Sequence, residues 1–505
     1  MKGVVAAGDK TTAKAAAQIL KEGGNAFDAA CAAMLTAPLS EPMLTSMGGG
    51  GFMMVYTPNN KPKLYDFFVD VTPRIVKEPD FFPIYVDFGT TVQEFHIGAS
   101  SIAIPGIVAG IEAVNKNLGK LPLSKIIQPA LNYAKEGVVL SELQASFVKL
   151  LEPILLSTKG SKELYAPNGK LIDSKHSVKN IDYALFLEAF AKEGAKLFYQ
   201  GEIAKKIDKI SKESGGDIRY EDLQNYQVKI REPLEFEYLN HKVYTNPPPS
   251  AGGILIAFIL ELIEYSNAKS VQDIEYIKEL IESMVVASEF RKTHIDPNLH
   301  DSELYKIIQD NRLLQEYRLS KKSRINLWGN TTHISVIDSF GNAASVTSTN
   351  GEGSGIVIPN SGIMLNNMLG EEDLNPHGFF KWQSGIRLPS MMAPTVVEKD
   401  GKITLALGSA GSNRIRSAIV EVIENFTRFN MPIQNAISAS RLHFEKGELF
   451  FEAGFNKDII ESAKKLYKVT EFSEKSLFFG GVNAVTADFK GGADERRGGA
   501  VEVVE

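Results

Sequence analysis

One segment, about two thirds of the way along the chain, constrains the fold more than any other. Residues 331–338 (TTHISVID) and residues 342–349 (NAASVTST) both read as β-strands, and Ser339-Phe340-Gly341 lies between them. A three-residue loop with glycine at its last, left-handed position is an established way to join two antiparallel strands. The segment is therefore predicted to form a β-hairpin in which Thr331 faces Thr349.

This pairing would bring two threonine hydroxyls together. Directly opposed residues have Cβ atoms about 4.5–5.5 Å apart on one face of the sheet, and His333 and Ser335 share that face. We expect the hydroxyl of Thr349 to hydrogen-bond the hydroxyl of Thr331 and to orient it. A cross-strand threonine pair can also be purely stabilising, and the hairpin alone leaves both roles open.

The rest of the chain predicts helices on both sides of an extensive sheet system. Residues 10–38 read as two Ala-rich helices, residues 121–235 are rich in helix formers, and strands and glycines dominate after Thr331. The last stretch, residues 480–504, is predicted to form two strands joined by a turn-rich loop. This order of elements favours an α+β fold or, more specifically, a layered αββα arrangement.

Two further stretches carry local predictions. MGGGGFMMVY, residues 47–56, is predicted to be a tight loop that leads into an apolar strand and brings its backbone close to another segment. A phosphate-binding P-loop is not favoured there, because no Lys-Ser or Lys-Thr follows the glycines. SKKSRINLWGN, residues 320–330, is polar and basic and suits an exposed loop open to cleavage.

Composition excludes several classes of protein. The 505-residue chain has a net charge of −6, so no basic excess is available for a nucleic-acid partner. Its hydrophobic fraction of 44% and charged fraction of 23% are ordinary for a globular protein. The one cysteine, Cys31, lies in an Ala-rich helical stretch and is predicted to be a buried structural thiol.

No run approaches 18 apolar residues, which predicts no membrane span. We find no signal peptide, which favours a cytoplasmic location over a secreted or periplasmic one and leaves these two as alternatives. The zinc motif H-E-x-x-H and the serine-hydrolase elbow G-x-S-x-G do not occur. The sequence therefore implies no metal and no organic cofactor.

Eight stretches, in order along the chain, resemble the motifs of the γ-glutamyltranspeptidase family. The four before Thr331 are KEGGNAFDAACAA, EPMLTSMGGGGFMMVY, IPGIVAGIEA and NPPPSAGG. The other four are TTHISVID, which starts at Thr331, and then GIMLNN, RLPSMMAPTVV and GSAGSNRIRSAI. The resemblance covers essentially the whole chain. It implies the N-terminal-nucleophile hydrolase fold, a four-layer αββα sandwich, in which a precursor cuts itself and the two pieces stay together as a heterodimer.

By this resemblance the nucleophile falls on Thr331. Cleavage between Asn330 and Thr331 would give a large-subunit segment, 1–330, and a small-subunit segment, 331–505, which form one interleaved unit. A threonine hydroxyl needs a base to become a nucleophile, and the α-amine exposed by cleavage has a reference pKa of about 7.7–8.0. No catalytic histidine is needed, so we assign His333 to the structure.

The implied reaction is acyl transfer from an amide to water or to an acceptor amine, through an acyl-enzyme on Thr331. Its tetrahedral intermediate needs oxyanion donors, each worth about 10²–10³ in rate. The paired-glycine motif of the family falls on Gly411 and Ser412, whose backbone N–H groups are the candidate donors. The same motif also reads as a strand-to-helix turn, and both interpretations can hold together.

The substrate-binding positions of the family are only partly retained. Phe68 and Val69 occupy the place of the arginine that binds the α-carboxylate in the family, and an arginine fork is hard to replace. The other substrate positions, among them the acid that binds the amine, fall on Gly351, Glu371, Ser390 and Met391. Three arginines nearby in the sequence are candidate replacements, although a structural role is favoured for the second of them: Arg387, Arg414 and Arg416.

Three functions follow as hypotheses. The first is a self-processing γ-glutamyltransferase or hydrolase that acts on glutathione-like amides. The second is a related acylase for a glutaryl-type or other small acyl amide, and the third is a non-catalytic relative that binds a small amide. Self-cleavage is the measurement that separates the third from the others, and a higher oligomer is compatible with all three.

Overall fold

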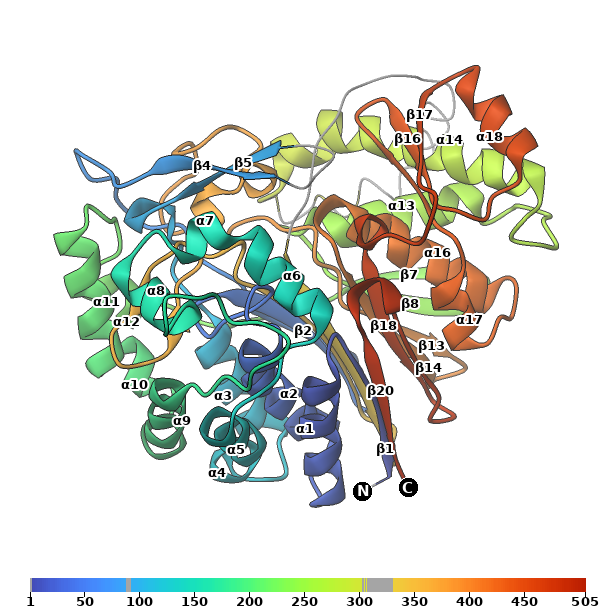
Figure 1. Ribbon diagram of the computed structural model, residues 1–505. Helices are drawn as coiled ribbons and strands as arrows, with labels where there is room; N and C mark the ends of the chain where they lie inside the picture. Colours follow the sequence, from blue (N-terminus) through green and yellow to red (C-terminus); the bar gives the residue numbers. More distant parts are fainter. Residues whose placement is uncertain (1, 88–91, 302–303, 305, 307–329) are drawn as a thin grey trace.

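The computed structural model describes residues 2–87, 92–301, 304, 306 and 330–505 (Figure 1). Of the stretch 320–330, which we predicted to be an exposed loop, residues 320–329 lie outside the described residues. Asn330, its last residue, is described and is still joined to Thr331, so this is the structure of the uncut chain.

Two antiparallel sheets form the centre of the molecule. The first has seven strands, in the order β20 (Ala500–Val504), β1 (Gly3–Ala7), β9 (Thr332–Asp338), β10 (Ala343–Thr349), β2 (Gly50–Tyr56), β3 (Lys63–Phe67) and β6 (Lys229–Arg231). The second has six, in the order β19 (Gly491–Ala493), β18 (Gly481–Thr486), β14 (Lys402–Ala410), β13 (Thr395–Lys399), β8 (His241–Thr245) and β7 (Leu234–Tyr238). β9 and β10 contact β14, so the two sheets pack face to face.

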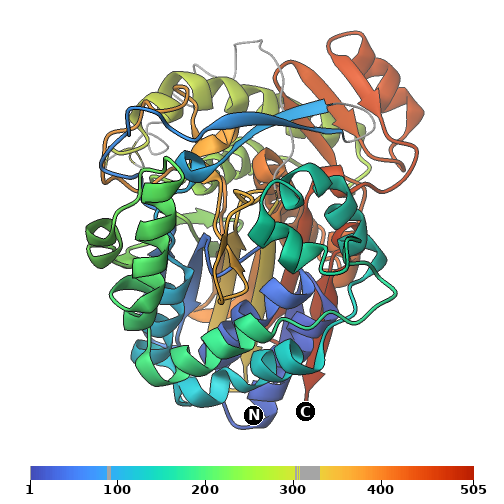
Figure 2. The same ribbon diagram turned by 60° about the vertical axis from the view of Figure 1, so that its left-hand side comes forward.

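Helices cover the outer face of each sheet. α1 (Lys10–Lys21) and α2 (Ala26–Ser40) pack on the first sheet, and α13 (Ala251–Ile263), α16 (Ile415–Thr427) and α17 (Ile433–Ser438) pack on the second. α14 (Ile274–Phe290) lies against α13, outside the second sheet. Figures 1 and 2 show these layers from two directions. The predicted αββα fold is confirmed.

The predicted Ala-rich helices begin at clear caps. The side chain of Asp9 accepts a hydrogen bond from the N–H of Thr11 at 2.7 Å and starts α1. Asn25 and Asp28 form a reciprocal capping box that starts α2. Cys31 lies within α2 and is fully buried, and burial raises the pKa of its thiol. Its predicted structural role is confirmed.

The glycine run before β2 allows the close backbone approach that we predicted. A Cβ atom on Gly48 would lie 2.3 Å from the carbonyl oxygen of Met364, and one on Gly49 would lie 2.1 Å from that of Thr349. Contacts this short are not tolerated by real side chains, so both positions require glycine. The run therefore packs against the end of β10, where Thr349 lies.

Strand β9 presents different side chains to its two faces, as the two-residue period of a strand requires. Ile334 and Val336 pack into the core beneath α1 and α2. His333 points the other way and is fully buried, with Nδ1 2.7 Å from Oγ1 of Thr347 and Nε2 2.9 Å from Oγ of Ser335. Burial lowers the pKa of His333 to about 3. The histidine is thus neutral and structural, as predicted.

The prediction for the C-terminal stretch is wrong in one respect. The stretch forms three strands, β18, β19 and β20, because residues 491–493 pair with β18. The chain then turns at Gly498, whose φ is +71°, and enters the other sheet as β20, beside β1. Local sequence pattern does not specify which sheet a strand joins, because that choice depends on its distant partner.

Membrane-spanning helices and metal-binding clusters are both absent from the described residues. None of their helices is both long and apolar enough to cross a membrane. Within the same residues, no group of three or more His, Cys, Asp or Glu side chains is placed to hold a metal ion.

Candidate active site

The β9–β10 hairpin has the predicted register. Ser348 pairs with Thr332, and the N–H of Asp338 donates to the carbonyl of Asn342 at 3.0 Å. Gly341 closes the loop with a φ of +79°, the left-handed conformation that glycine adopts without strain. Continued by one residue, this register brings Thr331 opposite Thr349 at the open end of the hairpin.

Thr349 contacts the peptide bond that we expect to be cut. Its hydroxyl donates a hydrogen bond to the carbonyl oxygen of Asn330 and accepts one from the N–H of Gly351 at 3.0 Å. The hydroxyl has a single proton, so it does not donate to the hydroxyl of Thr331, which we had predicted. In the uncut chain the carbonyl of Asn330 is the acceptor, and its oxygen already has a hydrogen-bond donor.

A small cavity of about 50 Å³ gathers most of the predicted site residues. The six that line it together come from distant parts of the sequence: Thr331, Thr349, Glu371, Ser390, Met391 and Ser412. Asn330 lines it as well. Gly351 and Gly411 do not line the cavity. Gly351 packs against Glu371 and Gly411 precedes Ser412, and both of these neighbours do line it.

Gly351 lies behind Glu371. It has a φ of +62°, and a Cβ atom there would be 2.3 Å from Oε1 of Glu371 and 2.2 Å from Oδ1 of Asn367. A side chain at this position would displace the carboxyl of Glu371 from the cavity. Gly351 therefore supports the site through its backbone, and we had predicted it as a direct substrate contact.

Gly411 and Ser412 form the turn between β14 and α16. Ser412 begins the short 3₁₀ turn Ser412–Arg414, and the first N–H groups of a helical start have no partner within it. Ser412 has a φ of +51°, in the left-handed region that favours glycine, and its hydroxyl donates to Asp373. This side-chain bond holds a conformation that serine adopts at a cost. Ser412, rather than Gly411, is the residue that reaches the cavity.

Two buried carboxyl oxygens near the cavity have no hydrogen-bond partner among the described residues. They are Oε1 of Glu371 and Oε2 of Glu352. Burial raises the pKa of both groups, to about 8 for Glu352, and each carboxyl disfavours the charge of the other. Sequence reasoning missed Glu352 because its place in a glycine-rich loop resembles a solvated turn.

Ser390 and Met391 belong to a segment that is fixed to the start of α13. The carbonyl of Ser390 accepts from the N–H of Ala251 at 2.8 Å, and its hydroxyl accepts from the N–H of Met392 at 3.0 Å. These bonds place the Ser390 hydroxyl and the Met391 side chain on the cavity wall.

The three arginines proposed as replacements do not reach the cavity, so that hypothesis is wrong. All three are at least 98% buried elsewhere. Arg387 pairs with Asp66 at 3.1 Å and with Asp70 at 3.2 Å. Arg414 lies 3.7 Å from Glu445, and Arg416 donates to the carbonyl of Asn413 at 3.0 Å. The arginine that does line the cavity is Arg291, which is distant in sequence.

Thr332, the second threonine of the pair, points away from the cavity. Its hydroxyl donates to Oε2 of Glu41 at 2.5 Å, and Thr12 donates to Oε1 of the same carboxyl at 2.9 Å. Glu41 is fully buried. Burial, followed by the nearby charge of Asp9, raises the pKa of Glu41 from 4.5 to about 8. The residue next to Thr331 is thus anchored to a buried acid.

This anchor predicts a pH-dependent stability. The folded pKa of Glu41 lies above its unfolded value, so the stability that the protonated group contributes is complete below about pH 4.5 and is lost as the pH rises through about 8. Relative to Glu41→Gln, the wild type should lose up to about 1.4 kcal/mol per pH unit in this window. The melting temperatures of both proteins from pH 5 to 9 test this, because other titrating groups cancel in the difference. Parallel curves would contradict it.

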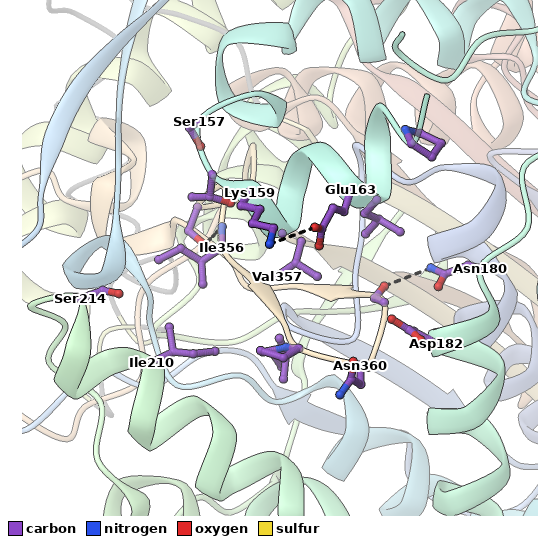
Figure 3. Close-up of a pocket in the computed structure, with 18 of the residues that line it drawn as sticks. Ser157, Lys159, Glu163, Asn180, Asp182, Ile210, Ser214, Ile356, Val357 and Asn360 are labelled. Atoms are coloured by element: carbon purple, nitrogen blue, oxygen red, sulfur yellow. Dashed lines mark hydrogen bonds and ion pairs between the residues drawn. The ribbon is translucent and has the colours of Figure 1, made fainter. Parts of the chain in front are cut away.

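A larger cavity, of about 760 Å³, contains none of the predicted site residues (Figure 3). It lies between α8 (Lys159–Tyr165), α9 (Ile181–Glu193) and the hairpin of β11 (Val357–Ile358) and β12 (Ile363–Met364). Two of its charged groups, Lys159 and Glu163, pair with each other at 3.7 Å. Size alone does not identify the reactive site, and the hairpin geometry favours the smaller cavity.

Comparisons with known proteins place the chain in one family. A family model described as gamma-glutamyltranspeptidase matches residues 12–504. The glutathione hydrolase proenzyme of Bacillus subtilis (strain 168) is 27% identical over 99% of this chain and 91% of that protein. The acylase ACY 1 proenzyme of Pseudomonas sp. (strain SE83) is 28% identical over 96% of this chain and 89% of that protein.

A solved structure supports the architecture. The cephalosporin acylase from Bacillus halodurans has a TM-score of 0.88 to this chain at 22% identity, and the match covers 100% of this chain and 96% of that one. At this identity the likeness shows the fold alone.

Proposed function

The chain belongs to the γ-glutamyltranspeptidase family, and from this premise we propose that it cuts itself between Asn330 and Thr331 and then uses Thr331 to transfer γ-glutamyl groups from amides to water or to an amine. The observation that carries the proposal is the hydrogen bond from Thr349 to the carbonyl oxygen of Asn330. A donor placed on that oxygen stabilises the negative charge that develops when the carbonyl is attacked.

Maturation then proceeds in two steps. The hydroxyl oxygen of Thr331 attacks the carbonyl carbon of Asn330, the C–N bond breaks, and the acyl group moves from nitrogen to oxygen as an ester. Water then hydrolyses the ester, which leaves a carboxylate on Asn330 and a free α-amine and hydroxyl on Thr331. The names of both relatives call them proenzymes, which supports such a step here.

In the mature protein the α-amine of Thr331 serves as the base. It takes the proton of the hydroxyl as the oxygen attacks the substrate carbonyl, and it gives a proton to the departing amine. The N–H groups at the start of the Ser412–Arg414 turn, whose first residue lines the cavity, are the candidates to bind the oxyanion. Water or an acceptor amine then takes the acyl group from Thr331.

The free carboxyl of Glu371 favours a γ-glutamyl group over other acyl groups. Its Oε1 atom is buried at the cavity without a partner in the described part of the chain, and an ammonium group would supply one. An approaching cation also favours the charged form of a carboxyl whose pKa is raised.

A related amide acylase, for a glutaryl-type or another small acyl group, is the second candidate, because Phe68 lines the cavity where the family has its carboxylate-binding arginine and the features that select a γ-glutamyl group are therefore only partly retained. A glutaryl group has the same chain length as a γ-glutamyl group and lacks only the amine. The two substrates therefore form a matched pair that separates the candidates.

The first test is the mass of the purified protein after incubation, with N-terminal sequencing of any fragments. We expect two associated chains, the smaller beginning Thr331-Thr332-His333. A single inert chain would instead support a non-catalytic relative.

Substrate choice is tested with γ-glutamyl and glutaryl p-nitroanilides. We expect Glu371→Gln to lower kcat/KM for the γ-glutamyl substrate by about 10- to 100-fold, the value of a hydrogen bond to a charged group. The glutaryl substrate should change little. The exposed neighbour Glu372 provides the control, Glu372→Gln. Equal losses on both substrates would contradict the assignment, and a wild type that prefers glutaryl amides would favour the second candidate.

A further inference from the structure

The cavity needs a cationic group if its substrate carries a carboxylate, and one arginine is placed to supply it. Arg291 follows α14 directly and starts the short turn Arg291–Ile295. It lines the nucleophile cavity and also an adjoining cavity of about 340 Å³. Phe68, which occupies the position of the family arginine, lines the nucleophile cavity with an apolar ring.

Arg291 is held in place by two of its three nitrogens. Nε donates to Oδ1 of Asp296 at 3.0 Å, and Nη1 donates to Oδ1 of Asn413 at 2.8 Å. Among the residues that the structure describes, Nη2 has no hydrogen-bond partner, although the side chain is only 15% exposed. The guanidinium plane is therefore fixed while one nitrogen keeps its donors unused.

The charge on Arg291 is retained. Burial acts to lower its pKa, but Asp296 and the other nearby carboxylates outweigh burial and raise it. Because Asp296 neutralises part of the charge, recognition here would depend mainly on directional N–H donors, which a carboxylate accepts well. A prepositioned side chain also loses little entropy when it binds a ligand.

We propose that Arg291 binds the α-carboxylate of the acyl group, opposite Glu371, which binds its ammonium. This rests on the proposed function and deepens it, because it assigns the recognition of the α-carboxylate to a residue on a different segment from the family arginine. Both residues line the cavity, and each has one polar atom without a hydrogen-bond partner among the described residues, Nη2 of Arg291 and Oε1 of Glu371. The zwitterionic end of a γ-glutamyl group offers a partner to each. Arg291 is then a specificity-determining residue that takes the role left vacant at Phe68.

The test uses two substrates that differ only in this carboxylate, γ-glutamyl p-nitroanilide and 4-aminobutyryl p-nitroanilide. Arg291→Gln should lower kcat/KM for the first by about 10- to 100-fold and should change the second by less than about twofold. Arg291→Lys keeps the charge but loses the planar guanidinium. Its kcat/KM for the first substrate should lie between those of the wild type and Arg291→Gln. Lys292→Gln is the matched control, since Lys292 is the next cation in the chain and lines only the adjoining cavity.

Self-cleavage of each variant is measured first by mass, so that a failure to mature is not mistaken for a loss of specificity. Equal losses on the two substrates would mean that Arg291 only supports Asn413 and the fold, and would overturn the proposal.

Calorimetric binding of L-glutamate against 4-aminobutyrate provides a readout without turnover. An inactive wild type that prefers glutamate through Arg291 would refute the proposed function but support this assignment. A wild type that is active and indifferent to the carboxylate would refute this assignment alone.

Discussion

Thr331→Ala is expected to remain a single chain of 55.4 kDa and to lose turnover by at least about 10⁴-fold. The substitution removes the one oxygen that both steps require, because the hydroxyl of Thr331 attacks the carbonyl of Asn330 during maturation and the substrate carbonyl afterwards. Neither nearby threonine replaces it, since the hydroxyl of Thr349 donates to the carbonyl of Asn330 and that of Thr332 donates to Glu41. Mass spectrometry and a p-nitroanilide assay measure both effects.

Two variants serve as controls for this prediction. Thr331→Ser keeps a nucleophile and should still cut itself. Thr36→Ala removes another buried threonine hydroxyl, which donates a hydrogen bond to the carbonyl of Ala32 in the same helix at 2.8 Å. This variant should retain both self-cleavage and turnover. Fragments that begin at residue 331 in Thr331→Ala would refute the nucleophile assignment.

Thr349→Val is expected to slow self-cleavage by about 10²–10³-fold, so that the uncut chain accumulates. Valine has nearly the shape of threonine but no donor, and it leaves the carbonyl of Asn330 without its hydrogen bond when the carbonyl is attacked. It also removes the acceptor of the N–H of Gly351. A time course of the intact and cut masses measures the rate.

Thr349→Ser restores the hydroxyl and should recover most of that rate. A melting temperature for each protein separates a chemical effect from unfolding, because the valine variant should remain folded while it fails to cut. Cleavage of Thr349→Val at the wild-type rate would show that the bond to Asn330 is structural only.

Local sequence was sufficient to predict the β-hairpin that carries Thr331. The glycine in the loop Ser339-Phe340-Gly341 sets the turn, and the turn sets the register that brings Thr331 to the open end of the hairpin opposite Thr349. The same holds for the capped helices in residues 10–38 and for the close approach of the glycine run to β10. In each case the determining interactions lie within a few residues of one another, or are imposed by one glycine.

Local sequence did not predict the contacts between segments that are distant in the chain. The hydroxyl of Thr349 bonds to Asn330 because of how the uncut chain enters the hairpin, and the C-terminal strands divide between two sheets because their partners are far away. Arg387, which is near the site in sequence, is enclosed by two aspartates.

The sequence by itself therefore determined the family, the fold class and the threonine on which we place the chemistry, since these depend on motifs and on local turn geometry. Only the tertiary structure decided which charged groups share the cavity with that threonine. Arg291 and Glu371 lie on segments that are far apart in the chain. Their meeting depends on how the helices pack over the two sheets, and packing follows from the burial of side chains throughout the molecule, not from the local sequence pattern.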